Sequence, residues 1–165
     1  MIEKAAALAE NKGWDFEILS PRQLAVAIAS PRWQFFHAVD IYCSIDGGAW
    51  GFVMLKEFEI LSEREQEVNL AVCRLQQFCE PGEFDLVQQP DCFIRYARDI
   101  DIAEEVETHL GSGINKALAK IDTAWTVLQL VNWGGKSVDE AIAHVGSSEL
   151  QELRTEQSSG SGKVE

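Results

Sequence analysis

Apolar and polar positions follow two periods in the first third of the 165-residue chain. Ile2 to Lys12 carries apolar residues at helical spacing, and Gly13 follows where a helix C-terminal cap is expected. Trp14 to Leu19 reads as extended, and Leu24 to Ile28 alternates with a period of two, so both segments are expected to be strands. Ser20-Pro21 would also suit the start of a short helix, so that alternative stays open.

The middle of the chain predicts a hairpin followed by a helix. Gln34 to Ile45 and Trp50 to Phe58 are rich in aromatic and β-branched residues, and Asp46-Gly47-Gly48 between them is typical of a hairpin turn. Ser62 to Glu65 has the sequence of a capping box, in which the Ser62 hydroxyl and the Glu65 carboxylate would bind free backbone amides. Val68 to Cys79 then repeats at helical spacing, which predicts a second helix.

The remaining pattern predicts two short strands and two helices. Phe84 to Val87 and Phe93 to Ala97 are expected to pair across a turn. A third helix is expected to begin at Asp101, with an acidic first turn, and to run to about Trp133. Its expected core positions are Val106, Leu110, Ile114, Ala117, Ile121, Ala124, Leu128 and Val131. A second capping box, Ser137 to Glu140, opens a short final helix.

This order of elements predicts an α+β fold in which one antiparallel sheet lies in a layer against helices. The length and the 46% hydrophobic content suit one domain, expected over residues 1–146, and the polar residues 147–165 are expected to form a flexible tail.

Charge and apolar content limit the classes of partner. The formal net charge is -13, and the sequence contains no basic stripe, so nucleic acids and anionic membranes are disfavoured as partners. No apolar run is long enough for a membrane span, and a cytoplasmic location is expected. Cys43, Cys73, Cys79 and Cys92 form no C-x-x-C pair and are expected to be small buried residues without disulfides.

Local motifs give little support for a reaction centre. Gly134-Gly135-Lys136-Ser137 imitates the end of a phosphate-binding loop, but a helix stop followed by an N-cap explains it better. The acidic group from Asp99 to Glu107 could hold a divalent cation, although carboxylates in a first helical turn are expected for dipole reasons alone. His37, His109 and His144 are scattered and have no local ligand or base partner. No cofactor, metal or catalytic residue is therefore predicted.

The end of the third helix is more apolar than one sheet face requires. Trp125, Val127, Leu130 and Trp133 extend the apolar stripe most of the way around the helix axis. Two interpretations follow: either the final short helix folds back over this region, or it is a surface for a second subunit or another protein.

The order of elements and three short motifs resemble the YbjN family, within the type III secretion chaperone-like superfamily. The motifs are Val68-Asn69-Leu70, Gly82-Glu83-Phe84-Asp85 and Phe93-Ile94-Arg95-Tyr96, and the resemblance covers residues 1–146. It implies a two-layer fold with an antiparallel sheet, a homodimer, and a role in binding other proteins rather than in catalysis. The segment from Ser20 to Arg32 and the helix after Trp133 depart from the secretion chaperones.

The leading hypothesis is therefore a non-enzymatic protein-binding module, chaperone-like or regulatory, that holds a segment of a protein client or regulatory partner. The candidate partner-binding residues are Leu70, Leu75 and Phe78 in the second helix and Trp125, Leu130 and Trp133 in the third. The alternative is a small enzyme or divalent-metal-binding protein that uses the acidic group from Asp99 to Glu107.

Overall fold

The computed structural model describes residues 2–44, 49–88, 92–101 and 107–145. Its elements in chain order are α1 (Ile2–Lys12), β1 (Asp15–Ser20), β2 (Gln23–Ala29), β3 (Phe36–Cys43), β4 (Ala49–Glu57), the 3-10 turn η1 (Ser62–Arg64), α2 (Glu65–Cys79), β5 (Glu83–Val87), β6 (Phe93–Asp101), the π-helical turn η2 (Glu107–Gly111), α3 (Ser112–Asn132) and α4 (Val138–Val145).

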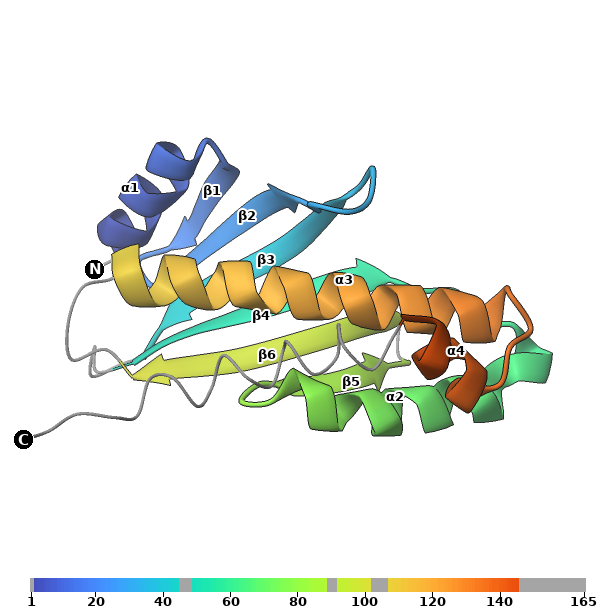
Figure 1. The fold of residues 1–165 in the computed structure, drawn as a ribbon. Helices are drawn as coiled ribbons and strands as arrows, with labels where there is room; N and C mark the ends of the chain where they lie inside the picture. Colours follow the sequence, from blue (N-terminus) through green and yellow to red (C-terminus); the bar gives the residue numbers. More distant parts are fainter. Residues whose placement is uncertain (1, 45–48, 89–91, 102–106, 146–165) are drawn as a thin grey trace, which may run out of the picture.

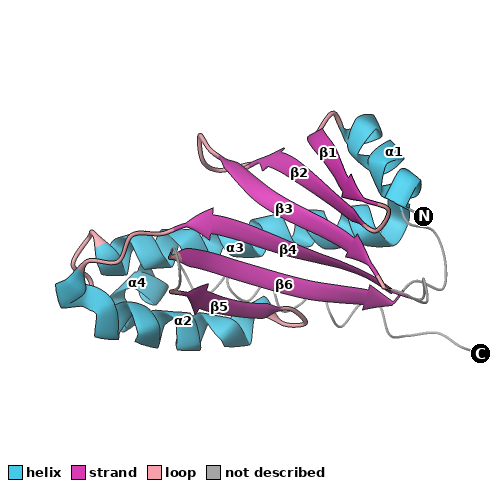
Figure 2. Cartoon of the chain, turned by 180° about the vertical axis from the view of Figure 1, so that it is seen from behind, coloured by secondary structure: helices cyan, strands magenta, loops and turns pink. Residues whose placement is uncertain are grey.

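The strands form one six-stranded sheet in the order β1-β2-β3-β4-β6-β5, and every neighbouring pair is antiparallel. Helix α3 crosses one face of this sheet, with α1 beside β1 and with α2 and α4 towards β5 (Figure 1). Seen from behind, the strands lie in front of the helices (Figure 2). The predicted α+β layer fold is confirmed, and the helices form one layer on one side of the sheet.

The core lies between the sheet and the helix layer. In β2 and β3 every second residue is buried. Val26 of β2, Val39 of β3 and Met54 of β4 are buried neighbours across the strands. From the helix side, Ile114, Ile121 and Leu128 of α3 are also buried. Seven of the eight expected core positions of the third helix are buried, and the eighth, Val106, lies outside the described residues.

Two helix ends follow their sequence signals. At the end of α1, Gly13 takes a φ of 67°, and the Trp14 amide donates to the Ala9 carbonyl at 2.9 Å, as expected for a glycine cap. At the start of α4, the Glu140 amide donates to Ser137 Oγ at 3.3 Å and the Ser137 amide donates to Glu140 Oε2 at 2.9 Å. The second capping box and the interpretation of Gly134 to Ser137 as a helix stop are therefore confirmed.

Two predicted features of helix starts, the first capping box and the beginning of the third helix at Asp101, were wrong. Neither η1 nor α2 has a side-chain cap, so the capping box of Ser62 and Glu65 does not form. Arg64 instead donates to the carbonyls of Val131 in α3 and of Lys136 in the α3–α4 connection, at 2.9 and 2.7 Å, and these contacts hold the chain in place. Asp101 ends β6 rather than starting a helix, because the β-ladder with β4 continues to that residue.

Asn132 joins the end of α3 to the connection between β4 and α2. Its side chain is buried; Oδ1 accepts the Leu61 amide at 3.0 Å, and Nδ2 donates to the Glu59 carbonyl at 2.8 Å. One amide side chain therefore satisfies a backbone donor and a backbone acceptor of an irregular segment. The buried side-chain amide of Asn132 needs such partners as well, which makes Asn132 a structural anchor.

Replacing Asn132 by Ala should lower the free energy of unfolding by about 1 to 3 kcal/mol, because two part-buried backbone groups lose their partners. Urea denaturation, monitored by circular dichroism, would measure this change in the free energy of unfolding. Asn115, an exposed residue of the same helix, provides the control, since Asn115→Ala should leave stability unchanged or raise it slightly. Equal losses in the two variants would contradict the anchoring role.

Candidate functional site

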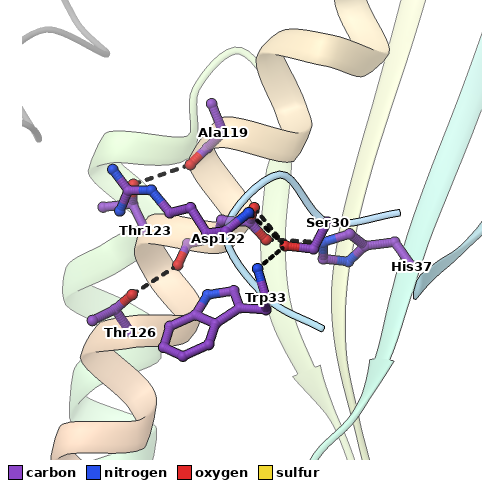
Figure 3. A network of polar contacts seen from close by, with 8 residues as sticks. Ser30, Trp33, His37, Ala119, Asp122, Thr123 and Thr126 are labelled. Carbon is purple, nitrogen blue, oxygen red and sulfur yellow. Dashed lines mark hydrogen bonds and ion pairs between the residues drawn. The ribbon is translucent and has the colours of Figure 1, made fainter. Parts of the chain in front are cut away.

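A buried polar network connects α3 to the segment between β2 and β3 (Figure 3). Asp122 of α3 is fully buried, and its Oδ1 lies 3.0 Å from Nε2 of the buried His37 in β3. Its Oδ2 accepts a hydrogen bond from Ser30 Oγ at 2.8 Å. Ser30 Oγ also accepts the Trp33 amide at 2.9 Å. One carboxylate thus holds two side chains that are distant from it in sequence.

Ser30, Asp122 and His37 have the residue types of a hydrolase triad, but their order is different. In a triad the serine hydroxyl bonds to histidine, which bonds to aspartate, whereas here both Ser30 and His37 bond to Asp122. His37 Nδ1 is buried without a hydrogen-bond partner among the described residues. The geometry therefore gives Ser30 no imidazole base, and the network acts in packing and orientation.

The candidate partner-binding residues of the second helix are in three different environments. Leu75 is 1% exposed and belongs to the core, whereas Leu70 is 55% exposed. Phe78 is half-buried against the core. The buried positions of α2 are Val68, Ala71, Val72, Leu75 and Cys79, so Leu70 is the member of this set that a partner could reach on α2.

The candidates of the third helix form part of an aromatic cluster at the end of α3. Trp125 is 7% exposed and its ring centroid lies 5.7 Å from that of Phe58, which in turn lies 5.2 Å from that of Trp133. Trp133 remains 48% exposed, and Leu130 is half-buried. Lys56 Nζ lies 4.4 Å from the Phe35 centroid and 5.6 Å from the Trp125 centroid, so a cation covers this cluster.

Helix α4 packs on α3 and also touches α2, with Val138 and Ala141 buried. Arg74 of α2 bonds to Asp139 of α4 at 2.6 Å. The final helix therefore folds back onto α3 and α2, as the first of the two interpretations expected, whereas the ring contacts of Trp125 come from Phe35, Phe58 and Trp133. Trp133 is the part of the apolar end of α3 that stays accessible.

The other predicted chemical groups are dispersed. Cys43 and Cys79 are buried and Cys92 is half-buried, but Cys73 is exposed, contrary to the expectation that it lies in the core. Burial raises the pKa of the Cys79 thiol to about 12, which makes it a poor nucleophile. Asp99 accepts a hydrogen bond from Tyr42, and among the described residues no three acidic, His or Cys side chains meet as metal ligands. Residues 102–106 of the acidic group lie outside the described part.

Two accessible surfaces were not among the predicted sites. One is the edge strand β1, where Phe16, Ile18 and Leu19 are 40%, 51% and 50% exposed. The other is the face of the sheet opposite the helices, which carries the exposed rings of Phe36 and Tyr42. The signals were the extended pattern of Trp14 to Leu19 for the first surface and the aromatic and β-branched residues of Gln34 to Ile45 for the second. Both patterns predicted strands but not which side the helices would cover.

A tyrosine lies flat on the helix-free face of the sheet. Gly51 of β4 is paired with Tyr42 of β3, and a Cβ on Gly51 would lie 2.2 Å from Tyr42 Cζ. The glycine therefore lets the ring cross β4, where the Tyr42 hydroxyl donates to Asp99 Oδ1 of β6 at 2.8 Å. Burial and the hydrogen bond with Asp99 raise the pKa of Tyr42 to about 12.

Comparison with solved structures relates the fold to YbjN from E. coli, whose structure is described as that of a proposed transcription regulator. The match covers 75% of this chain and 87% of that chain, with a TM-score of 0.54 and 8% sequence identity. No protein-family model and no curated protein sequence matches. The chain therefore has a YbjN-like fold. In the described residues, no helix has both the length and the apolarity to cross a bilayer.

Replacing Asp122 by Ala should lower the free energy of unfolding by at least about 2 kcal/mol, because His37 and Ser30 both lose their acceptor in a buried site. Asp139→Ala is the matched control: its pair with Arg74 is exposed and should contribute at most about 1 kcal/mol. Chemical denaturation of both variants would measure the difference. A loss for Asp122→Ala no larger than that for Asp139→Ala would contradict the anchoring role of Asp122.

The chain has two tyrosines, and the pKa of each is raised from 10.0 to about 12, mainly by burial. An absorbance titration of tyrosinate should therefore find both midpoints near pH 12 while the chain stays folded. The folded state holds these protons longer than the unfolded state does, so this stability contribution is present below pH 10 and is lost as the pH rises towards 12. Asp99→Asn should lower the midpoint of Tyr42, whereas Asp85→Asn should not. An unchanged midpoint in Asp99→Asn would contradict the proposed cause.

Proposed function

We propose that this chain is a non-enzymatic protein-binding module, chaperone-like or regulatory, and that its edge strand β1 binds an extended segment of another protein. The observation that carries the proposal is the exposure of β1. Five of its six residues are exposed and Ser20 is half-buried. Phe16, Ile18 and Leu19 present apolar side chains there, where burial against a partner would be favourable.

The backbone of β1 supports strand addition. In the described part of the chain, β1 pairs with β2 on one side and no strand pairs with its other edge. An edge strand has unpaired amides and carbonyls that can bind a further strand, and apolar side chains on it increase that tendency. Backbone pairing would give affinity, and the side chains of β1 would select the sequence.

The side-chain pattern of β1 indicates what the added strand would meet. Phe16 and Ile18 lie opposite Val26 and Leu24 and therefore face the helix side of the sheet. Asp15 and Glu17 lie opposite Ala27 and Ala25 and face the other side. A bound segment with apolar residues on one face and basic residues on the other would match both sides.

A second copy of the chain is one candidate for the bound segment, since the homodimer implied by the family resemblance stays a prediction. Strand β1 of one copy could pair with β1 of another about a two-fold axis. Sedimentation velocity of the wild-type chain and of an Ile18 variant would separate this case from a different partner.

Ile18→Lys should abolish capture of a partner from the native cell extract, because a charge would then replace an apolar contact at the centre of β1. Leu70→Lys is the matched control, since Leu70 is exposed to a similar extent, 55% against 51% for Ile18, and lies on α2. Affinity capture with quantitative mass spectrometry would compare both variants with the wild type, and circular dichroism would verify folding. Proteins lost with Leu70→Lys but retained with Ile18→Lys would overturn the assignment to β1 in favour of α2.

A further inference from the structure

The face of the sheet opposite the helices is uncovered in the described part of the chain. The four α-helices of the described residues lie on one side (Figure 1), and the view from behind shows the strands with no described element in front of them (Figure 2). Along the strands of an antiparallel sheet with one open face, the residues that point to that face are usually polar. This face instead has a small, apolar middle.

Strand register defines the middle of this face. Ala27, Ala38 and Leu55 are neighbours on β2, β3 and β4. In the adjacent row Val53 of β4 pairs with Ala97 of β6. Most of these side chains are half-buried although no described helix covers them. Small side chains leave the surface flat, and Tyr42 contributes to this by lying on Gly51.

Carboxylates surround and interrupt this flat middle. The acidic residues that the pairing places on this face are Asp15, Glu17, Asp40, Glu57, Glu83, Asp85 and Asp99. Among the described side chains, the basic residue on it is Arg95, which is paired with Asp85 at 3.1 Å. The face therefore combines a strong negative potential with an apolar platform.

One row of residues crosses the whole sheet and shows this combination directly. It runs through Glu17, Ala25, Asp40, Val53, Ala97 and Glu83, one residue from each strand. Because neighbouring strands are about 4.8 Å apart, its three carboxylates are spaced by roughly 10 and 14 Å. A helix rises about 1.5 Å per residue, so basic residues about seven and then nine or ten positions apart would match them.

We propose that this face binds a basic amphipathic helix of a partner protein, which lies across the strands along the row from Glu17 to Glu83. Its apolar side would rest on Ala27, Ala38 and Leu55, and its Lys and Arg side chains would reach the carboxylates. Charge complementarity selects this occupant. A second copy placed face to face would bring the same carboxylates together, and a phosphate backbone or an anionic lipid surface would be repelled.

This inference rests on the protein-binding role proposed above and adds a second surface and the chemistry of its partner. It is separate from strand addition, because the bound helix would lie on the face of the sheet and the bound strand at its edge. The two ideas can therefore be tested independently.

The test uses the full chain and a labelled synthetic peptide with Leu and Ala on one helical face and Lys and Arg on the other. Two peptides serve as controls: one with Glu in place of the basic residues, and one with the basic peptide's composition in scrambled order. Fluorescence anisotropy should show binding of the basic amphipathic peptide alone, weakening as salt is raised. Binding of the scrambled peptide with equal affinity would overturn the proposal.

Charge reversal locates the site. Asp40→Lys combined with Glu83→Lys should lower the affinity for the basic peptide by at least about tenfold. Glu10→Lys combined with Glu63→Lys changes the net charge equally at exposed positions of α1 and η1 and should weaken it by no more than about twofold. Equal losses in the two double variants would show general attraction to an acidic protein and would overturn the proposal.

Two further results separate this surface from the alternatives. Ile18→Lys should leave the affinity for the peptide unchanged. If that variant no longer binds the peptide, the peptide binds at β1, and the proposed site on the open face is overturned. A wild-type dimer that dissociates in the Asp40 and Glu83 double variant would identify a second copy as the occupant and would also overturn it. If Ile18→Lys has no effect on partner capture while the peptide still binds in a charge-dependent way, strand addition at β1 is rejected and the open-face site is supported.

Discussion

The buried carboxylate of Asp122 is the constraint on which the arrangement of the two layers depends. It has two oxygens, and each binds a different part of the chain: one binds His37 of β3 and the other binds Ser30, which lies between β2 and β3. A buried carboxylate without such partners would be strongly unfavourable. The rotation and position of α3 over the sheet are therefore tied to the strands by a polar requirement as well as by apolar packing. Asn132, the last residue of α3, binds the connection between β4 and α2 in the same way, through hydrogen bonds of its side-chain amide.

Because these anchors all lie on one side, the helices form a single layer and the sheet has two unlike faces. The inner face holds the core, and no described helix covers the outer face (Figure 2). The edge at β1 is accessible as well, since five of its six residues are exposed. The proposal of protein binding thus rests on the surfaces that the helix layer leaves uncovered. At the aromatic end of α3, which the sequence singled out, Trp125 is enclosed by Phe35, Phe58 and Lys56, and Trp133 stays accessible.

Local signals predicted the elements well because their causes are local. Gly13 at a positive φ and the reciprocal bonds of Ser137 and Glu140 depend on a few neighbouring residues. Ser62 had the same capping pattern, but tertiary contacts of Arg64 with Val131 of α3 and with Lys136 beyond it determined that turn instead. The partners of Asp122 are 85 and 92 positions away, which no local pattern reveals. Likewise, the alternation of Leu24, Val26 and Ile28 with alanines predicted a strand, but the accessible face follows from where α3 packs.

The contrast between the two faces also has an evolutionary consequence. Side chains such as Ala38 and Ala97 contribute little to the core, so mutational drift towards larger or polar residues there would be tolerated by folding. Selection acting on these positions would then come from an external contact. Homologous chains that conserve the row of small and acidic residues on this face would be expected to share the binding function. Homologues that conserve Asp122 but not this row would share only the fold.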